Sequence, residues 1–193
     1  MNLVLIKYNA GNIGSVLNAL GRLGLEAEVT DDPATIRGAD KVIFPGVGEA
    51  STTMRYLREN GLDRVIPSLT QPVLGICLGM QLLCSWSEEG DTKGMGVFDE
   101  KVRLFRVNEK IPHMGWNSIS FTPEGLFAQL TPGAYVYFVH SFYAETGMQT
   151  LATCRHGIDF SAALRRDNFY ATQFHPEKSG ETGLRILQNF LDL

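Results

Sequence analysis

A cysteine between two glycines is the pattern in this chain best suited to covalent chemistry. Gly75 and Gly79 stand two residues before and two residues after Cys77, which is the spacing of a G-x-nucleophile-x-G turn. An apolar run over 71–76 precedes the cysteine and a helical pattern follows it, so the segment predicts a tight turn from strand to helix. Bulky neighbours would clash in such a turn, which explains the glycines. The turn would present the Cys77 thiol at a helix N-terminus, where the helix dipole favours the nucleophilic thiolate.

A base and an orienting carboxylate occur near the end of the sequence. His175 and Glu177 are separated by Pro176 and follow an expected strand over 169–174. In an extended segment this spacing places both side chains on one side of the backbone. His175 could then accept the thiol proton while Glu177 holds the imidazole in the right tautomer. The sequence therefore predicts a triad in the order Cys, His, Glu.

Four segments together resemble a known enzyme family. The elbow over 75–81 and the segment over 174–179 are similar to those of the class I, or triad, glutamine amidotransferases. The turn over 45–48 (PGVG) and the segment over 112–117 (PHMGWN) resemble the glutaminase subunits of imidazole glycerol phosphate synthase. The resemblance covers essentially the whole chain and implies a single glutamine amidotransferase type 1 domain over 1–193.

The resemblance implies a flavodoxin-like α/β fold, and the hydrophobic periodicity favours the same class. Apolar runs alternate with helical patterns in the first half, which predicts a mostly parallel central sheet flanked by helices. The second half is richer in strands and predicts an antiparallel extension after residue 95. The expected strands are 2–8, 26–30, 41–44, 73–76, 101–105, 116–121, 135–142, 150–155, 162–165 and 169–174, and the expected helices are 12–23, 50–58, 78–86 and 183–193.

The resemblance also implies a reaction for the predicted triad. Cys77 would attack the side-chain amide of L-glutamine, and His175 would pass the thiol proton to the departing ammonia. A glutamyl thioester would remain on Cys77 until water activated by His175 releases glutamate. Two backbone N–H groups would hold the oxyanion: that of Leu78, the residue after the nucleophile, and that of Val47.

Two glycines, Gly46 and Gly48, flank Val47 and would let its peptide rotate. Together with the resemblance, this implies that the resting chain lacks a complete oxyanion hole until a partner delivers a signal. The turn over 45–48, Cys77 and His175 all follow expected strand ends, where parallel sheets bind their ligands. The substrate contacts that the resemblance implies are Gly46, Gly48, Gln81, His140, Ser141 and Phe142.

Ammonia must stay unprotonated to act as a nucleophile, and release into water would protonate most of it. In the family that the chain resembles, the ammonia passes to a cyclase subunit with a (βα)₈-barrel fold. That subunit converts N'-[(5'-phosphoribulosyl)formimino]-5-aminoimidazole-4-carboxamide ribonucleotide (PRFAR) into imidazole glycerol phosphate, a histidine precursor, and an aminoimidazole carboxamide ribonucleotide (AICAR). The resemblance therefore implies a heterodimer with such a cyclase, and no cofactor. Lys7 stands where many relatives carry an acidic residue, which affects the details of this contact. The expected contact residues are Asn12, within the segment over 8–12, and Met114, Trp116 and Lys178.

Composition argues against several other classes of protein. A length of 193 residues suits one domain with a substantial core. The net charge of −4, without a basic tract, speaks against a nucleic-acid partner. The short apolar start lacks the basic region of a signal peptide, and no apolar run is long enough to span a membrane, so we expect a cytoplasmic protein. Three cysteines without a CxxC pair favour free thiols over a disulfide framework or a metal site.

Other interpretations stand beside this one. The chain could serve another amidotransferase, such as those of anthranilate or pyridoxal phosphate synthesis, although the segment over 112–117 speaks against it. A closer rival is a paralogous pair that amidates a sugar of a surface polysaccharide. A non-catalytic binding module and a stand-alone γ-glutamyl hydrolase are further alternatives. For single residues, Cys84 and Cys154 are typical of buried packing positions, His140 of a structural strand end, and 88–91 of a solvated loop.

Overall fold

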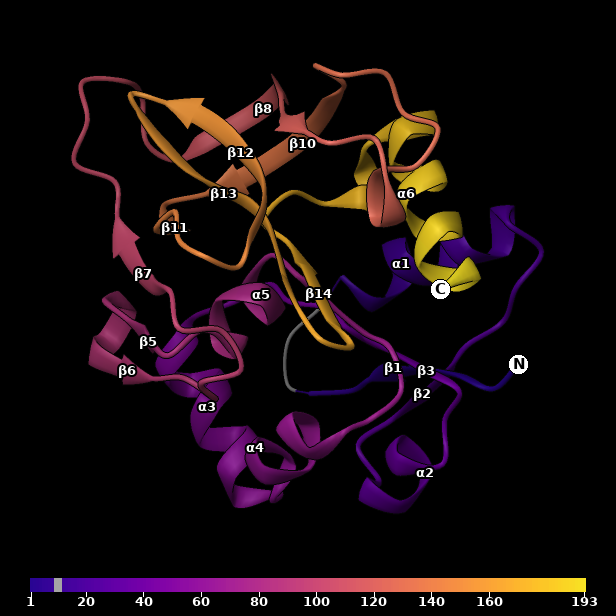
Figure 1. Cartoon of the computed structure of the whole chain (residues 1–193). Coiled ribbons are helices and arrows are strands. Elements are labelled where there is room, and N and C mark those ends of the chain that lie inside the picture. Colours follow the sequence, from indigo (N-terminus) through magenta and orange to yellow (C-terminus); the bar gives the residue numbers. More distant parts are fainter. Residues whose placement is uncertain (9–11) are drawn as a thin grey trace.

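The computed structural model describes residues 1–8 and 12–193, and an eight-stranded sheet forms its centre (Figure 1). The strands of this sheet are β1 (Leu3–Ile6), β2 (Glu28–Thr30), β3 (Lys41–Phe44), β4 (Val73–Ile76), β9 (Ser120–Phe121), β12 (Thr150–His156), β13 (Ile158–Arg166) and β14 (Phe169–Thr172). Their order is β2-β1-β3-β4-β14-β13-β12-β9. Neighbours from β2 to β14 are parallel, and those from β14 to β9 are antiparallel. The predicted α/β class with an antiparallel extension is thereby confirmed.

Helices cover both faces of the parallel part of the sheet (Figure 1). They are α1 (Ile13–Arg22), α2 (Pro33–Arg37), α3 (Ala50–Glu59), α4 (Leu62–Val65), α5 (Leu78–Leu83) and α6 (Gly180–Asp192). Along β1, Val4 and Ile6 belong to the apolar core under α2 to α5. Leu3 and Leu5 belong to the core under α1 and α6. All four side chains are buried, as expected for a strand that is covered on both faces.

Two smaller sheets are built from the remaining strands. The first pairs β8 (His113–Ser118) with β10 (Tyr135–His140), and the second has the order β11-β7-β5-β6, formed by β11 (Phe142–Ala144), β7 (Lys101–Leu104), β5 (Trp86–Ser87) and β6 (Thr92–Lys93). Short 3₁₀ turns occur at η1 (Ile66–Ser68), η2 (Glu89–Asp91), η3 (Gly125–Phe127) and η4 (Pro176–Lys178). Residues of β10, β11 and η2 line the cavity described below.

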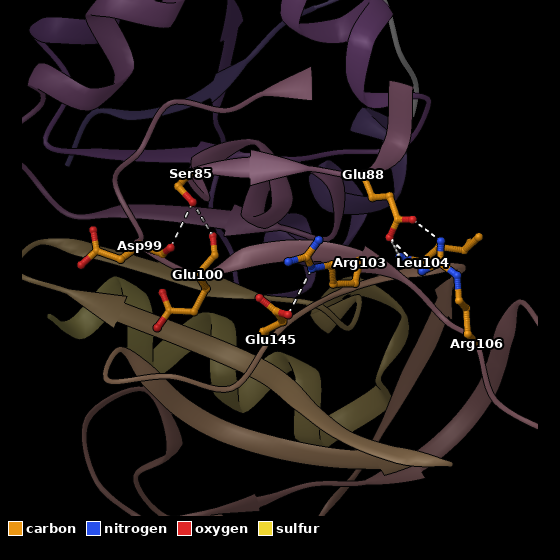
Figure 2. Close-up of polar contacts among 8 residues, drawn as sticks. All are labelled: Ser85, Glu88, Asp99, Glu100, Arg103, Leu104, Arg106 and Glu145. Atoms are coloured by element: carbon orange, nitrogen blue, oxygen red, sulfur yellow. Dashed lines mark hydrogen bonds and ion pairs between the residues drawn. The ribbon is translucent and has the colours of Figure 1, made fainter. Parts of the chain in front are cut away.

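Polar contacts fasten the four-stranded sheet to the turn that starts at Glu88 (Figure 2). Glu88 accepts a hydrogen bond from the Leu104 N–H at 3.0 Å and forms an ion pair with Arg106. Arg103 pairs with Glu145 at 3.1 Å. Exposed ion pairs of this kind contribute little stability, but the bond to the Leu104 backbone fixes where the turn lies. The segment over 88–91, expected as a solvated loop, is therefore held against β7.

The expected elements differ from the observed ones mainly at their ends. The helix expected over 78–86 ends at Leu83, because the backbone of Cys84 is extended and the Ser85 N–H bonds to the Glu100 carbonyl. The strand expected over 135–142 is divided into β10 and β11. The segment over 112–117 contributes most of β8, so the strand expected over 116–121 begins three residues earlier, at His113.

Candidate active site

Three neighbouring parallel strands end at the same edge of the central sheet, and each is followed by a predicted site segment. The turn over 45–48 follows β3, Cys77 follows β4, and His175 follows β14. A cavity of about 380 Å³ opens where these segments meet. Its walls are formed by Val47, Gly48, Cys77, Leu78, Gln81, Glu89, Pro112, Val139, His140, Ser141, Phe142 and His175.

Cys77 lies on a strained elbow between β4 and α5. Its φ of 53° and ψ of −106° are unusual for a residue with a side chain, and such conformations persist where the surroundings enforce them. The flanking glycines permit the close packing, because a Cβ on Gly79 would lie 2.1 Å from the Phe44 carbonyl oxygen. A Cβ on Gly75 would lie 2.8 Å from a Leu83 methyl carbon. The spacing of the glycines thus matches a steric need.

His175 and Glu177 form a buried pair beside Cys77. His175 Nδ1 lies 2.7 Å from Glu177 Oε1, and both side chains are almost fully enclosed. Within the described part of the chain, His175 Nε2 has no hydrogen-bond partner. Burial alone would lower the pKa of His175, but negative charge on Cys77 and the hydrogen bond and charge of Glu177 outweigh it and raise this pKa. Transfer of the Cys77 proton to His175 would therefore give a stabilised ion pair.

Asn12, which the sequence predicts at the partner contact, lies beside the His175–Glu177 pair. Its Nδ2 donates to Glu177 Oε1, the oxygen that also bonds to His175. Asn12 therefore helps to orient the carboxylate, a role that its place in the sequence did not reveal. Residues 9–11 of the segment over 8–12 lie outside the described residues.

The predicted oxyanion donors are not both turned toward the cavity. The Leu78 N–H approaches the Gly46 carbonyl oxygen at 3.4 Å. Because that carbonyl and the Val47 N–H belong to one trans peptide, the Val47 N–H points the opposite way. The preceding peptide of the turn is held by Tyr8, whose buried hydroxyl donates to the Pro45 carbonyl at 2.6 Å. In this conformation a rotation of the Gly46–Val47 peptide would be needed to complete the hole.

Glycine is required on both sides of the Val47 peptide. A Cβ on Gly46 would lie 2.3 Å from the Gly79 backbone nitrogen, so the turn packs directly on the elbow helix. Gly48 has a φ of 126°, a conformation that residues with side chains rarely adopt. The two glycines thus allow the close packing and the positive φ of this turn.

Gln81 faces the cavity and is held by two hydrogen bonds. Its Nε2 donates to the Phe142 carbonyl at 2.9 Å and to Gln173 Oε1 at 3.0 Å. Gln173, which the sequence analysis did not single out, donates in turn to Cys77 Sγ at 3.6 Å. Both amide hydrogens of Gln81 are thereby used, so its carbonyl oxygen is the group left to accept from a ligand.

Glu89 is a second side chain near Cys77 that the sequence analysis did not single out, and it lines the cavity. It lies in η2, and of the described residues that line the cavity it is the one carboxylate. Its Oε2 accepts from the Ala50 N–H at 2.9 Å, and burial raises its pKa. Neither its type nor its spacing distinguishes it from the neighbouring acidic residues, because only the fold brings η2 to the cavity.

The remaining predicted residues divide between the cavity wall and the surface. His140, Ser141 and Phe142 line the cavity, whereas Met114 and Trp116 are 63% and 55% exposed. Lys178, next to the buried pair, is also exposed, as is Tyr135 on the strand that pairs with β8. Period-two alternation along β8 places Met114 and Trp116 on one face of the strand and His113 and Asn117 on the other.

The described residues contain no cluster of His, Cys, Asp or Glu side chains that could hold a metal ion. None of the helices over residues 1–8 and 12–193 is long and apolar enough to cross a membrane.

The amino-acid sequence matches known proteins along its whole length. The model of the family "Glutamine amidotransferase class-I" matches residues 4–193. The protein "Imidazole glycerol phosphate synthase subunit HisH" of Bacteroides fragilis strain YCH46 is 58% identical over 100% of both chains. The protein of the same name from Escherichia coli strain K12 is 44% identical, again over 100% of both chains.

Solved structures share the fold at lower sequence identity. A crystal structure of a glutamine amidotransferase has a TM-score of 0.77 and 23% identity, and the match covers 98% of this chain and 97% of the other. The structure of PurLQS from Thermotoga maritima has a TM-score of 0.73 and 16% identity, with 99% and 97% covered. The chain thus belongs to the class I glutamine amidotransferase family and, within it, to the group of imidazole glycerol phosphate synthase subunits HisH.

Proposed function

We propose that this chain is the glutaminase subunit of an imidazole glycerol phosphate synthase and hydrolyses L-glutamine to glutamate and ammonia. The observation that carries the proposal is the buried His175–Glu177 pair beside a positive-φ cysteine on the wall of a cavity. The names of its relatives at 44–58% identity support the choice of synthase.

In this proposal Cys77 is the nucleophile and His175 the general base. His175 takes the thiol proton, and a bond forms between Cys77 Sγ and the amide carbon of glutamine. Collapse of the tetrahedral intermediate breaks the carbon–nitrogen bond while His175 returns the proton to the leaving ammonia. Water then attacks the thioester with His175 as base, which releases glutamate. Glu177, held by Asn12, keeps the imidazole oriented and balances its charge.

The polar groups of the cavity suit the two ends of a glutamine molecule. Glu89, with its half-buried carboxylate, can pair with the α-ammonium group. The Gln81 oxygen and the backbone at Gly48 and at 140–142 can contact the amino-acid end or the carboxamide. Gly46 acts here as the hinge of the oxyanion turn, where a Cβ would meet the Gly79 nitrogen.

The Gly46–Val47 peptide would gate the reaction. With its carbonyl on the Leu78 N–H, the site offers the developing oxyanion no free pair of donors. Rotation would release the Leu78 N–H and turn the Val47 N–H inward. An oxyanion donor is worth roughly 3 kcal/mol of transition-state stabilisation, so this rotation alone could change the rate by a hundredfold or more.

A (βα)₈-barrel cyclase is the proposed partner in a heterodimer, and it would receive the ammonia to convert PRFAR. The exposed face of β8 and β10 supports this, because Met114, Trp116 and Tyr135 are each more than half exposed. Apolar side chains grouped on a surface in this way are typical of an interface. Lys178 lies next to the triad pair and would complete the contact.

The chain would work as a single domain over 1–193 in the cytoplasm, with neither nucleic acid nor membrane as a partner. Its three cysteines, none of them paired in the described structure, suit a reducing compartment.

The proposal is tested by glutamate release from glutamine. The chain is assayed alone, then with the cyclase subunit, and then with the cyclase and its nucleotide ligand. We expect negligible release by the chain alone and a large rise in the liganded complex. The variant Cys77→Ala should abolish release in the complex, while ammonia-dependent cyclisation by the barrel continues.

Each other outcome points to one of the rival interpretations. Full activity without a partner would indicate a stand-alone hydrolase of the γ-glutamyl hydrolase kind. No activity under any condition would indicate a binding module or a different partner, including a sugar-amidating one. Normal release by Cys77→Ala would exclude Cys77 as the nucleophile.

A further inference from the structure

Three of the four histidines of this chain lie together behind the cavity wall. His113 on β8 is directly opposite His140 on β10, and its Nδ1 lies 2.9 Å from His140 Nε2. The ring of His156 stacks on that of His113, with their centroids 4.2 Å apart. His113 and His140 are 5% and 6% exposed. Buried ring nitrogens need hydrogen-bond partners, and all four of these nitrogens have one.

The hydrogen bonds through this cluster can run in one direction only. His140 Nδ1 lies 2.7 Å from the Phe142 carbonyl oxygen, which can only accept, so Nδ1 carries the hydrogen. In the neutral ring His140 Nε2 must then accept, and His113 Nδ1 donates to it. His113 Nε2 accepts from Asn117 Nδ2 at 3.1 Å. The Asn117 amide cannot turn over, because its Oδ1 accepts from the Ser118 N–H at 2.9 Å.

The Phe142 carbonyl joins this chain of hydrogen bonds to the catalytic cysteine. It accepts from His140 Nδ1 and also from Gln81 Nε2 at 2.9 Å. Gln81 donates its other hydrogen to Gln173, which contacts Cys77. The position of the Phe142 carbonyl therefore sets the rotamer of Gln81, the side chain that faces the ligand.

The chain of hydrogen bonds requires neutral rings. A proton on His140 Nε2 would face the N–H of His113 Nδ1, and neither could accept. Burial lowers the pKa of His113 to about 4 and that of His140 to about 3, so both rings are neutral near pH 7. The other titratable groups that act on them are His156 and His175.

We infer that His113 and Asn117 are positioning residues of the glutaminase site, which hold Gln81 in its ligand-binding rotamer through His140 and the Phe142 carbonyl. The inference rests on the proposed function, since glutamine is the ligand that Gln81 would meet. The inference also gives each face of β8 a separate role. The inner face orients the substrate site, and the outer face carries the exposed side chains of the proposed interface.

Three variants of the complex with the cyclase subunit test this inference by steady-state glutaminase kinetics. His113→Phe keeps the ring stack but removes both hydrogen bonds, and we expect a KM for glutamine about tenfold higher, or about 1.4 kcal/mol. We expect kcat to stay within about twofold, because Cys77 and His175 are untouched. His113→Asn places an amide N–H near the former Nδ1 and should restore KM.

His156→Phe is the matched control. It changes the same stack, but His156 bonds only to the Lys110 carbonyl among the described residues, outside the hydrogen-bonded chain. KM should therefore stay at the wild-type value. Thermal unfolding of all variants shows that each is folded. An unchanged KM for a folded His113→Phe, or an equal rise for His156→Phe, would overturn the inference.

A second readout does not depend on catalysis. Imidazole ¹⁵N chemical shifts of the wild-type chain alone should show His140 as the Nδ1–H tautomer at pH 7, and the same in His113→Asn. The Nε2–H tautomer would overturn the inference. If the wild-type complex proved inactive, the proposed function would fail while the tautomer still decided whether the hydrogen-bonded chain exists.

Discussion

Glu177 illustrates how much of the site depends on one buried charge. A single oxygen of this carboxylate accepts from both His175 Nδ1 and Asn12 Nδ2. Burial disfavours an imidazolium, yet the pKa of His175 is raised, in part through Glu177. A buried charge without a partner costs several kcal/mol. After Cys77, the carboxylate is therefore the group that does most to raise the pKa of His175.

We expect Glu177→Gln to lower the glutaminase kcat by roughly 10⁴-fold, the loss seen when a triad aspartate is replaced by its amide. The amide can still hold the ring, but it cannot balance the imidazolium. The readout is glutamate release by the complex at saturating glutamine. Glu181→Gln is the control, because the Glu181 side chain is 88% exposed and, among the described residues, bonds only to Arg22. A kcat for Glu177→Gln within tenfold of wild type would contradict the assigned role.

At the scale of elements, the elbow depends on how closely α5 approaches β3. The two elements touch at Gly79, because a Cβ added there would lie only 2.1 Å from the Phe44 carbonyl oxygen. We expect Gly79→Ala to lower the free energy of unfolding in urea by about 2–3 kcal/mol, because backbone must shift to make room.

Gly21→Ala in α1 is the matched control. Apart from its chain neighbours and the backbone of its own helix, no described atom lies within 4 Å of the Cβ that it would add. Removing a glycine from a helix usually stabilises it by about 0.5–1 kcal/mol, so the two substitutions should have opposite signs. Equal stability of Gly79→Ala and wild type would show that the elbow can relax without cost.

The elements that sequence patterns predicted best are those with unbroken apolar runs. β3 and β4 coincide with their expected ranges, 41–44 and 73–76, because buried parallel strands are apolar throughout. The two-residue strands β5 and β6 were not predicted, since their conformation comes from pairing with β7 and with each other rather than from local preference.

The site shows the same division. The elbow and the segment around His175 are local, so spacing alone placed them at strand ends. Glu89 reaches the cavity only through the packing of distant segments, and the contact of Gln173 with Cys77 likewise joins two distant segments. Asn12 was singled out for another reason, and its bond to Glu177 spans 165 positions of the sequence. No pattern within one segment carries information of that kind.

At the scale of the whole molecule, the cavity forms where the three sheets meet. Cys77 and His175 follow strands of the central sheet, His140 comes from the two-stranded sheet, and Phe142 from the four-stranded sheet. The histidine cluster lies at the same junction, since His156 belongs to a strand of the central sheet. The stability of this junction should therefore depend on pH.

The sign of that dependence follows from burial. His113 and His140 have native pKa values of about 4 and about 3, below the value of about 6.5 expected in the unfolded chain. Above pH 6.5 both states are neutral and the full stability is present. As the pH falls from 6.5 toward 4, the two histidines take up protons in the unfolded chain but stay neutral in the native one. The free energy of unfolding therefore decreases. Each histidine should account for up to about 2 kcal/mol between pH 6.5 and 5.

Urea unfolding of the chain alone, at pH values from 5.0 to 7.5, measures this loss. His113→Asn removes one of the two titrating rings while keeping a donor to His140, so its stability should fall by about 2 kcal/mol less than that of wild type over the same range. The comparison of slopes cancels the carboxylates that both chains share. Parallel slopes would mean that His113 takes up its proton equally in the native and unfolded states. His113 would then not be a neutral, hydrogen-bonded ring where the sheets meet.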